Sequence, residues 1–302
     1  MLLIQTLNGL QFGALLFLLA AGLTLVFGVM NFVNLAHGSL YMMGAYFGAA
    51  VANATGSFAL ALVVAIPAAL LLGILVERIA LAGLHRRDHL DQVLATFGLV
   101  LCFNELVRMI WGPSPVYAQV PEALSGTVPL FGIEYPAYRF AIIVIGLLVA
   151  AGLWWLIHRT RLGMLIRAGA THAAIVSALG VNIRLLNTLI FGLGAALAGL
   201  AGLMAGPLLA VQPGMGEPIL ILTLVVIVVG GIGSIRGAFL AALLIGVVDT
   251  LGRSFLPLWL GELVDAQVAQ TVAPALGSML IYLLMAAVLA LRPQGLFPAA
   301  GR

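Results

Sequence analysis

The chain has 302 residues, of which 63% are hydrophobic and only 8% are charged. Soluble domains carry about 25% charged residues, so the composition indicates an integral membrane protein. All 13 basic residues are arginine, and a P-loop needs a lysine on the nucleotide phosphates. The chain itself is therefore not a P-loop ATPase. A single cysteine, Cys102, allows no internal disulfide and no multi-cysteine metal site.

Four polar side chains interrupt the first 76 residues, which contain no Asp, Glu, Lys or Arg. They are Asn31, Asn34, His37 and Tyr41. On a continuous helix, spacings of three, three and four residues would place them near one face. Lipid offers such groups no hydrogen-bond partners. We therefore expect them either to close a break between two membrane helices or to face a solute that passes.

Nine apolar segments approach the length of about 20 residues that a membrane-spanning helix needs. They cover residues 6–29, 35–55, 58–80, 92–112, 139–158, 187–209, 217–233, 236–252 and 271–291. The sequence therefore predicts an all-α polytopic membrane protein, a bundle of eight or nine transmembrane helices in a single domain over residues 1–302. We expect re-entrant or broken helices near 30–37, where polar residues interrupt the apolar block, and near 230–237, where the short seventh and eighth segments meet at several glycines.

The arginines indicate how the chain is oriented in the membrane. If all nine segments cross, most arginines fall on one side, namely Arg78, Arg86, Arg87, Arg159, Arg161, Arg167, Arg184, Arg236, Arg292 and Arg302. The other side receives only Arg108, Arg139 and Arg253, with most of the acidic residues. Positive charge accumulates in cytoplasmic loops, so we expect the N-terminus outside and the C-terminus in the cytoplasm. The arginines form no basic run with interleaved aromatics, which argues against nucleic acid as a partner.

Two connecting segments lie on the predicted outer side. Residues 113–138 are rich in proline, and residues 253–270 fit an amphipathic interfacial helix or a plain loop equally well. Near the outer end of the fourth segment, Glu105 and Arg108 have the spacing of a structural ion pair on a helix. Asp249, near the outer end of the eighth segment, has no obvious local partner.

The longest connection on the predicted cytoplasmic side covers about residues 160–186 and is rich in alanine. Apolar residues recur there with helical spacing, at Ala170, Ala174, Ala178 and Val181. Gly180, followed by Val181 and Asn182, predicts that this helix stops. An apolar surface helix needs a cover, which is either the lipid interface or a docked cytoplasmic partner.

Small residues carry two further patterns. A ladder at four-residue spacing in segment 187–209 predicts close packing between helices, at Gly194, Ala198, Gly202 and Gly206. The glycines from Gly231 onward superficially resemble a dinucleotide fingerprint, but its third glycine position is Arg236 and no βαβ unit surrounds it. We interpret them instead as a break between two half-length helices, which transporters use for sites and hinges.

Three motifs together resemble one family. They are N-F-x-N-L-A-H-G with Y-M-x-G-A-Y (Asn31 to Tyr46), R-A-x-A with A-L-G-V-N (Arg167 to Asn182), and V-x-G-G-I-G-S-I-x-G-A (Val228 to Ala238). Their order and separation are similar to those in the inner-membrane permeases of branched-chain amino acid ABC transporters, specifically the LivH-type subunit. The resemblance covers nearly the whole chain.

This resemblance implies a transport subunit without a catalytic site, a cofactor or a metal of its own. It implies a second related permease subunit in a heterodimer, two cytoplasmic ATPase subunits and a periplasmic solute-binding protein as partners. The solute would be a branched-chain or other hydrophobic amino acid, with urea, amides or other amino acids as alternatives. A stand-alone secondary transporter would need intramembrane charges that the central segments lack. A membrane enzyme would need a nucleophile–base or metal set, and none stands out.

Two sets of residues are candidates for function. The resemblance implies ATPase coupling through the segment that contains Arg167, Ala168, Ala170, Ala174, Gly180 and Asn182. The translocation path or gate is expected at Asn31, Asn34, His37, Tyr41, Gly230, Gly231 and Gly233. The alternative is structural, with the asparagines capping helix ends and His37 a satisfied histidine. Relatives often carry acidic residues after R-A-x-A, where this chain has Thr171 and His172, so the polarity of the ATPase contact is left open.

Overall fold

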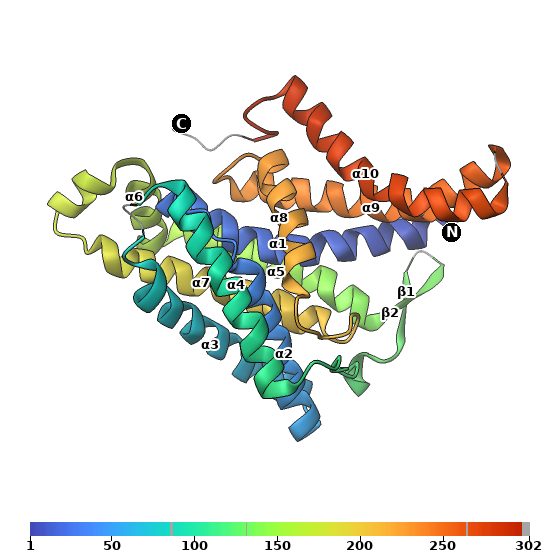
Figure 1. The fold of residues 1–302 in the computed structure, drawn as a ribbon, viewed down its shortest axis with the longest axis horizontal. Helices are drawn as coiled ribbons and strands as arrows, with labels where there is room; N and C mark the ends of the chain where they lie inside the picture. The colour runs from blue at the N-terminus through green and yellow to red at the C-terminus, as the bar shows by residue number, and fades with distance from the viewer. Residues whose placement is uncertain (85–86, 131, 264, 298–302) are drawn as a thin grey trace.

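The computed structural model describes residues 1–84, 87–130, 132–263 and 265–297 (Figure 1). Its helices are α1 (Leu2–Met30), α2 (His37–Thr55), α3 (Phe58–Val76), α4 (His89–Trp111), α5 (Ala137–Arg159), α6 (Arg161–Ala178), α7 (Ile183–Ala205), α8 (Gly216–Gly230), α9 (Ile235–Leu263) and α10 (Ala266–Leu291). A π-helical turn, Glu77–Leu81, continues α3, and a 3-10 turn covers Glu122–Leu124. Strands β1 (Thr127–Leu130) and β2 (Ile133–Pro136) form an antiparallel hairpin, with Thr127 opposite Pro136.

All nine predicted apolar segments are helices, so the predicted all-α polytopic fold is confirmed. Within the described residues, seven helices are long and apolar enough to cross a membrane. α8 has only 15 residues, which gives it a length of about 22 Å. The hydrocarbon core is about 30 Å thick, so α8 is too short to cross alone. In Figure 1 it runs across α1 and not alongside it.

The centre of the bundle is built on glycine contacts between α1, α2 and α7. A Cβ atom on Gly202 of α7 would collide with the Tyr41 carbonyl oxygen of α2, and one on Gly44 would collide with Gly199. Small residues let helix backbones approach closely where lipid supplies no hydrophobic drive. The packing role predicted for the small residues of segment 187–209 is therefore confirmed.

One end of the bundle collects most of the arginines, and we call it the arginine-rich end. α1, α5, α8 and α10 end there, while α4, α7 and α9 begin there, and α6 lies across it (Figure 1). The arginines at this end are Arg78, Arg87, Arg159, Arg161, Arg167, Arg184, Arg236 and Arg292. Arg86 and Arg302, predicted for the same side, lie outside the described residues.

The opposite end is closed by the β-hairpin and by polar contacts between helix ends. Asn8 of α1 accepts hydrogen bonds from the Tyr135 hydroxyl at 3.1 Å and from Arg139 at 2.8 Å. The Tyr138 hydroxyl donates to the Met204 carbonyl oxygen at 2.8 Å. These contacts fix the starts of α1 and α5 against the end of α7.

Segment 253–270 differs from both of its predicted forms, because α9 continues through Pro257 to Leu263. A proline removes one backbone donor and bends a helix without always ending it. The continuous helix places Arg253 one turn after Asp249, and the two side chains form an ion pair at 2.7 Å. Asp249 therefore has a local partner, which the sequence analysis did not identify. The predicted pair of Glu105 and Arg108 is confirmed at 2.8 Å.

Candidate functional site

The chain turns back into the bundle between α1 and α2. Asn31 ends α1 in the left-handed conformation (φ 49°, ψ 39°), which asparagine tolerates better than most residues. His37, the first residue of α2, places its Nε2 atom 3.2 Å from the Leu19 carbonyl oxygen. Leu19 lies eleven residues before the end of α1, which is about 16 Å along the helix axis. α2 therefore begins deep inside the bundle.

This turn separates the four polar residues that the sequence placed near one another. Asn31 is exposed at the end of α1, Asn34 is buried in the connection, and His37 and Tyr41 are buried one helical turn apart on α2. A single helical face holding all four does not form, because the left-handed Asn31 stops α1. The alternative expectation, a break between two membrane helices, is confirmed. Their place on a translocation path stays a prediction.

Buried polar atoms gather around the turn. Within the described residues, five such atoms have no hydrogen-bond partner, namely Thr24 Oγ1, Asn34 Oδ1, Asn34 Nδ2, His37 Nδ1 and Tyr46 Oη. An unsatisfied buried group costs about 1–3 kcal/mol, and lipid supplies no compensation. Thr24 and Tyr46 are not among the predicted site residues, although both are polar residues inside the uncharged block of 76.

The N-terminal ends of α2 and α8 meet inside the bundle. A Cβ atom on Gly38 would collide with the Gly216 carbonyl oxygen, so the two helix starts touch through backbone. Each helix start carries partial positive charge from its unpaired N–H groups. Broken helices that present such ends at depth form binding sites in many transporters.

A polar contact from α4 holds the start of α8 in place. Asn104 donates from Nδ2 to Glu217 Oε1 at 2.6 Å and accepts from the Gly214 N–H at 3.2 Å. Glu217 belongs to the first turn of α8, where a carboxylate is favoured by the helix dipole. The sequence analysis missed this pair, and the only signal was an acidic residue at the start of an apolar segment.

The predicted glycine break lies between α8 and α9, at residues 231–234. Gly230 packs directly against Gly237 of α9, and Gly233 lies against Gly28 of α1. Gly231 has a φ of +104° and faces residues 294–297, which follow α10. There the N–H groups of Leu296 and Phe297 donate to the carbonyl oxygens of Val229 and Gly230. Close backbone packing therefore accounts for these glycines, and their role at a gate stays a prediction.

α6 is joined to its neighbours by two short, capped corners. Thr160 accepts from the Gly163 N–H at 3.0 Å, and a Cβ atom on Gly163 would collide with carbonyl oxygens of α5. At the other end, Gly180 has a φ of +89°, as the predicted helix stop requires. Asn182 caps α7 by accepting from the Leu185 N–H at 3.1 Å. Gly180 and Asn182 thus shape the corner after α6.

The outward face of α6 is apolar and exposed. Arg167, Ala170 and Ala174 are exposed and Ala168 is half-buried, while Gly163, Ile166, Gly169 and Val176 face the bundle. Large apolar side chains also lie on the exposed face or just beyond it, namely Met164 (55% exposed), Ile175 (58%) and Leu179 (79%). The helical periodicity predicted at Ala170, Ala174 and Ala178 is confirmed, with these residues on the uncovered side, whereas Val181, the fourth residue of that pattern, lies beyond the end of α6.

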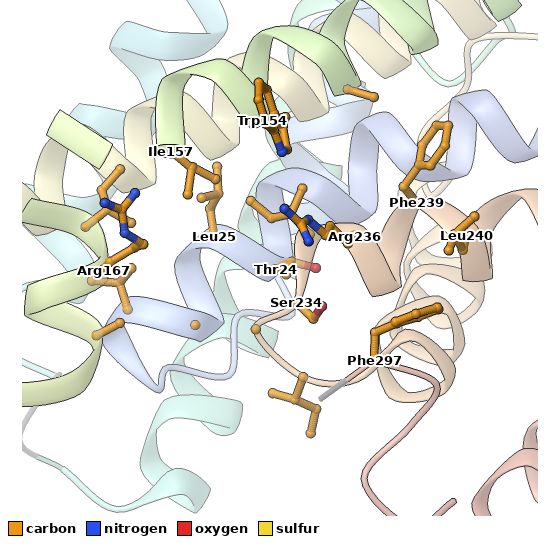
Figure 2. A pocket seen from close by; sticks show the side chains of 18 of the residues that line it. Thr24, Leu25, Trp154, Ile157, Arg167, Ser234, Arg236, Phe239, Leu240 and Phe297 are labelled. Carbon is orange, nitrogen blue, oxygen red and sulfur yellow. The ribbon is translucent and has the colours of Figure 1, made fainter. Parts of the chain in front are cut away.

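A cavity of about 1000 Å³ opens at the arginine-rich end (Figure 2). Parts of α1, α5, α6, α9 and the segment after α10 form its walls. It brings together Gly233 of the predicted path with Arg167 and Ala170 of the predicted coupling segment. The residues Asn31, Asn34, His37 and Tyr41 do not line it. Thr24, whose hydroxyl has no partner among the described residues, does line it.

Within the described part of the chain, no group of three His, Cys, Asp or Glu side chains is arranged to hold a metal ion. The fold thus presents a polytopic helical membrane protein with an uncovered helix at one end. A family model described as "Branched-chain amino acid transport system / permease component" matches residues 5–289, and the chain belongs to this family.

Individual relatives agree with this membership. The chain is 31% identical to the high-affinity branched-chain amino acid permease BraD of Pseudomonas aeruginosa, over 82% of this chain and 85% of that protein. It is 29% identical to the permease LivH of Escherichia coli, over 83% and 86%. The ribose import permease RbsC of E. coli is 28% identical, over 77% and 72%. No solved structure matches the chain.

Proposed function

We propose that the chain is the membrane permease subunit of an ATP-driven importer of branched-chain or other hydrophobic amino acids. The observation that carries this proposal is α6, an exposed apolar helix joined to α5 and α7 by capped corners. The family membership supplies the transport class. The names of BraD and LivH supply the proposed substrate class, and RbsC makes ribose the comparison that an uptake assay has to include.

In this proposal the arginine-rich end faces the cytoplasm. Eight of the arginines in the described residues lie there, against Arg108, Arg139 and Arg253 at the opposite end. Most of the acidic residues lie toward that opposite end. This distribution supports the orientation, because positively charged loops are retained in the cytoplasm. The N-terminus would then be outside, where a periplasmic solute-binding protein delivers the solute.

ATP hydrolysis is assigned to partner subunits. The chain has no lysine, which a P-loop requires. Two ATPase subunits would dock on α6 of this chain and on the corresponding helix of a second, related permease. The exposed side chains of Met164, Ile175 and Leu179 supply the apolar surface of the contact, and Arg167 supplies a charge at its edge.

The same helix would transmit the movement of the ATPases. Gly163 fits α6 tightly onto the end of α5, while Ile166 is buried on the inward side. A rigid push on α6 therefore reaches α5 and α1 without bending the corner. Rocking of packed helices around a central site is the usual basis of alternating access. The touching starts of α2 and α8, with the unpartnered groups of Asn34 and His37 nearby in the chain, are the proposed centre of that movement.

Substitution of Ile175 tests the docking proposal. An acidic side chain there should remove ATPase subunits from the purified complex, because it places charge in an apolar contact. The exposed position predicts normal insertion and folding. Ile175→Leu, which keeps the apolar surface, is the matched control and should retain the ATPases.

If Ile175→Glu leaves both ATPase co-purification and ATP-driven uptake unchanged, α6 is not the docking helix. That outcome would favour the alternative in which the lipid interface covers this face. If the complex transports ribose and not branched-chain amino acids, the docking result still stands, and only the proposed substrate class is overturned.

A further inference from the structure

The cavity at the arginine-rich end has a distinct charge. Arg167 of α6, Arg236 of α9 and Arg292 after α10 reach it from three separate segments, and His158 of α5 also lines it. No acidic side chain is among its described lining residues. Figure 2 shows Arg236 between Trp154 of α5 and Thr24 of α1. The cavity therefore carries positive charge that no acidic side chain among its described lining residues neutralises.

The arginines are available for a ligand. In the part of the chain that the structure describes, the guanidinium groups of Arg167 and Arg236 have no hydrogen bond or ion pair with another residue. Arg292 makes one long bond, from Nη1 to the Leu296 carbonyl oxygen at 3.3 Å. Guanidinium groups are the side chains best suited to bind phosphate oxygens, because they offer two parallel donors.

The walls of the cavity are apolar below this charged rim. Phe17, Leu25, Phe239 and Leu240 line it together with the aromatic ring of Trp154. Among them lies the hydroxyl of Thr24, which is 1% exposed and has no partner in the described residues. The cavity therefore combines guanidinium groups that can bind phosphate, the buried Thr24 hydroxyl and apolar side chains that can pack against hydrocarbon.

A free amino acid is a poor occupant of this space. Its ammonium group would meet three guanidinium groups and no carboxylate, which costs Coulomb energy at short range. An acidic protein segment would satisfy the rim but would leave the apolar walls of Phe17 and Phe239 uncovered. An anionic phospholipid satisfies both, and basic pockets between membrane helices bind such head groups.

We propose that this cavity binds one anionic phospholipid of the leaflet at the arginine-rich end. Its phosphate lies between Arg236 and Arg292, and an acyl chain lies along Phe239, Leu240 and Trp154. Because the lipid contacts α1, α6 and α9 together, it stabilises the arrangement of the helix proposed to receive the ATPases.

Native mass spectrometry of the delipidated full-length chain tests the proposal. Dioleoyl phosphatidylglycerol and dioleoyl phosphatidylcholine, which share acyl chains, should differ in affinity by about tenfold or more, since an arginine near an anionic lipid contributes about a factor of five. Arg236→Gln should weaken phosphatidylglycerol binding at least about fivefold and leave phosphatidylcholine binding unchanged. Arg108→Gln, at the exposed opposite end, is the control and should alter neither.

Further outcomes separate the alternatives. Equal binding of the two lipids, or an unchanged phosphatidylglycerol affinity in Arg236→Gln, would overturn the proposal. Glycerol 3-phosphate that binds as tightly as the lipid would also overturn it, because the apolar walls would then contribute nothing. If Arg236→Gln releases the ATPases while lipid binding is intact, the rim belongs to a protein contact. Size-exclusion chromatography of each variant shows that the fold is retained.

Discussion

His37 and Leu19 make the contact that fixes where the second helix starts. The imidazole Nε2 atom lies 3.2 Å from the Leu19 carbonyl oxygen, and the ring is fully buried. Leu19 belongs to the middle of α1, so the contact holds the start of α2 at depth instead of at the membrane surface. The polar turn of residues 31–36 returns into the bundle because of it.

Replacement of His37 by phenylalanine should destabilise the protein. The change keeps an aromatic ring of similar shape but removes the Nε2 contact to Leu19, at a cost of about 0.5–1.5 kcal/mol. Thermal unfolding in detergent measures the loss. A variant with an unchanged midpoint but reduced uptake would instead give His37 a role in transport, and one unchanged in both would contradict the anchoring role.

Gly202 should not tolerate even a methyl group. A Cβ atom there collides with the Tyr41 carbonyl oxygen, and overpacking of this kind typically costs 1–3 kcal/mol. Gly98 of α4 is a matched control, since a Cβ atom on it meets nothing within 4 Å. Gly98→Ala should be neutral or stabilise its helix by about 0.5–1 kcal/mol. Equal unfolding midpoints for Gly202→Ala and Gly98→Ala would argue against the packing described.

Gly163→Ala should uncouple the protein without touching the face proposed for docking. The added methyl group collides with carbonyl oxygens of α5, so α6 has to move away from its corner. ATPase subunits should still co-purify, while solute uptake per ATP hydrolysed falls several-fold. Gly152→Ala on α5, where a Cβ atom has no neighbour within 4 Å, serves as the control. Loss of ATPase binding in Gly163→Ala would show that the corner controls docking as well.

Gly295→Val should detach the segment that follows α10. Gly295 has a φ of +82°, and a Cβ atom on it would lie 2.6 Å from the Gly231 nitrogen. A β-branched residue is strained at such a φ and also clashes there. The segment should become accessible to protease, and hydrogen exchange at Leu296 and Phe297 should rise. Unchanged protection of these two amides would show that the contact with the glycine break is not maintained in solution.

Much of the fold follows from apolar length and small-residue spacing. Both patterns are visible in neighbouring residues of the sequence, so the nine apolar segments that form helices and the close packing of Gly202 were predictable. The helix stop at Gly180 followed from a residue that adopts φ > 0 readily. Glycines likewise identified the break near 230–237, and polar residues inside an apolar block identified the one near 30–37.

Other features depend on contacts between distant segments. The inward return of α2 depends on His37 meeting Leu19, and the start of α8 depends on Asn104 of α4 meeting Glu217. No local pattern encodes such pairs. The extension of α9 through Pro257 was missed because proline and acidic residues were interpreted as a separate interfacial helix or a loop. The charged cavity was missed because its three arginines lie far apart in the sequence.

The most direct test of the central proposal is solute uptake into vesicles that contain this chain with its second permease and ATPase subunits. The proposal predicts that leucine, isoleucine or valine accumulates only when ATP and a matching solute-binding protein are present. It also predicts that Ile175→Glu abolishes this accumulation while Ile175→Leu preserves it. Uptake by the chain without ATPases, or uptake that is independent of ATP, would contradict the proposal.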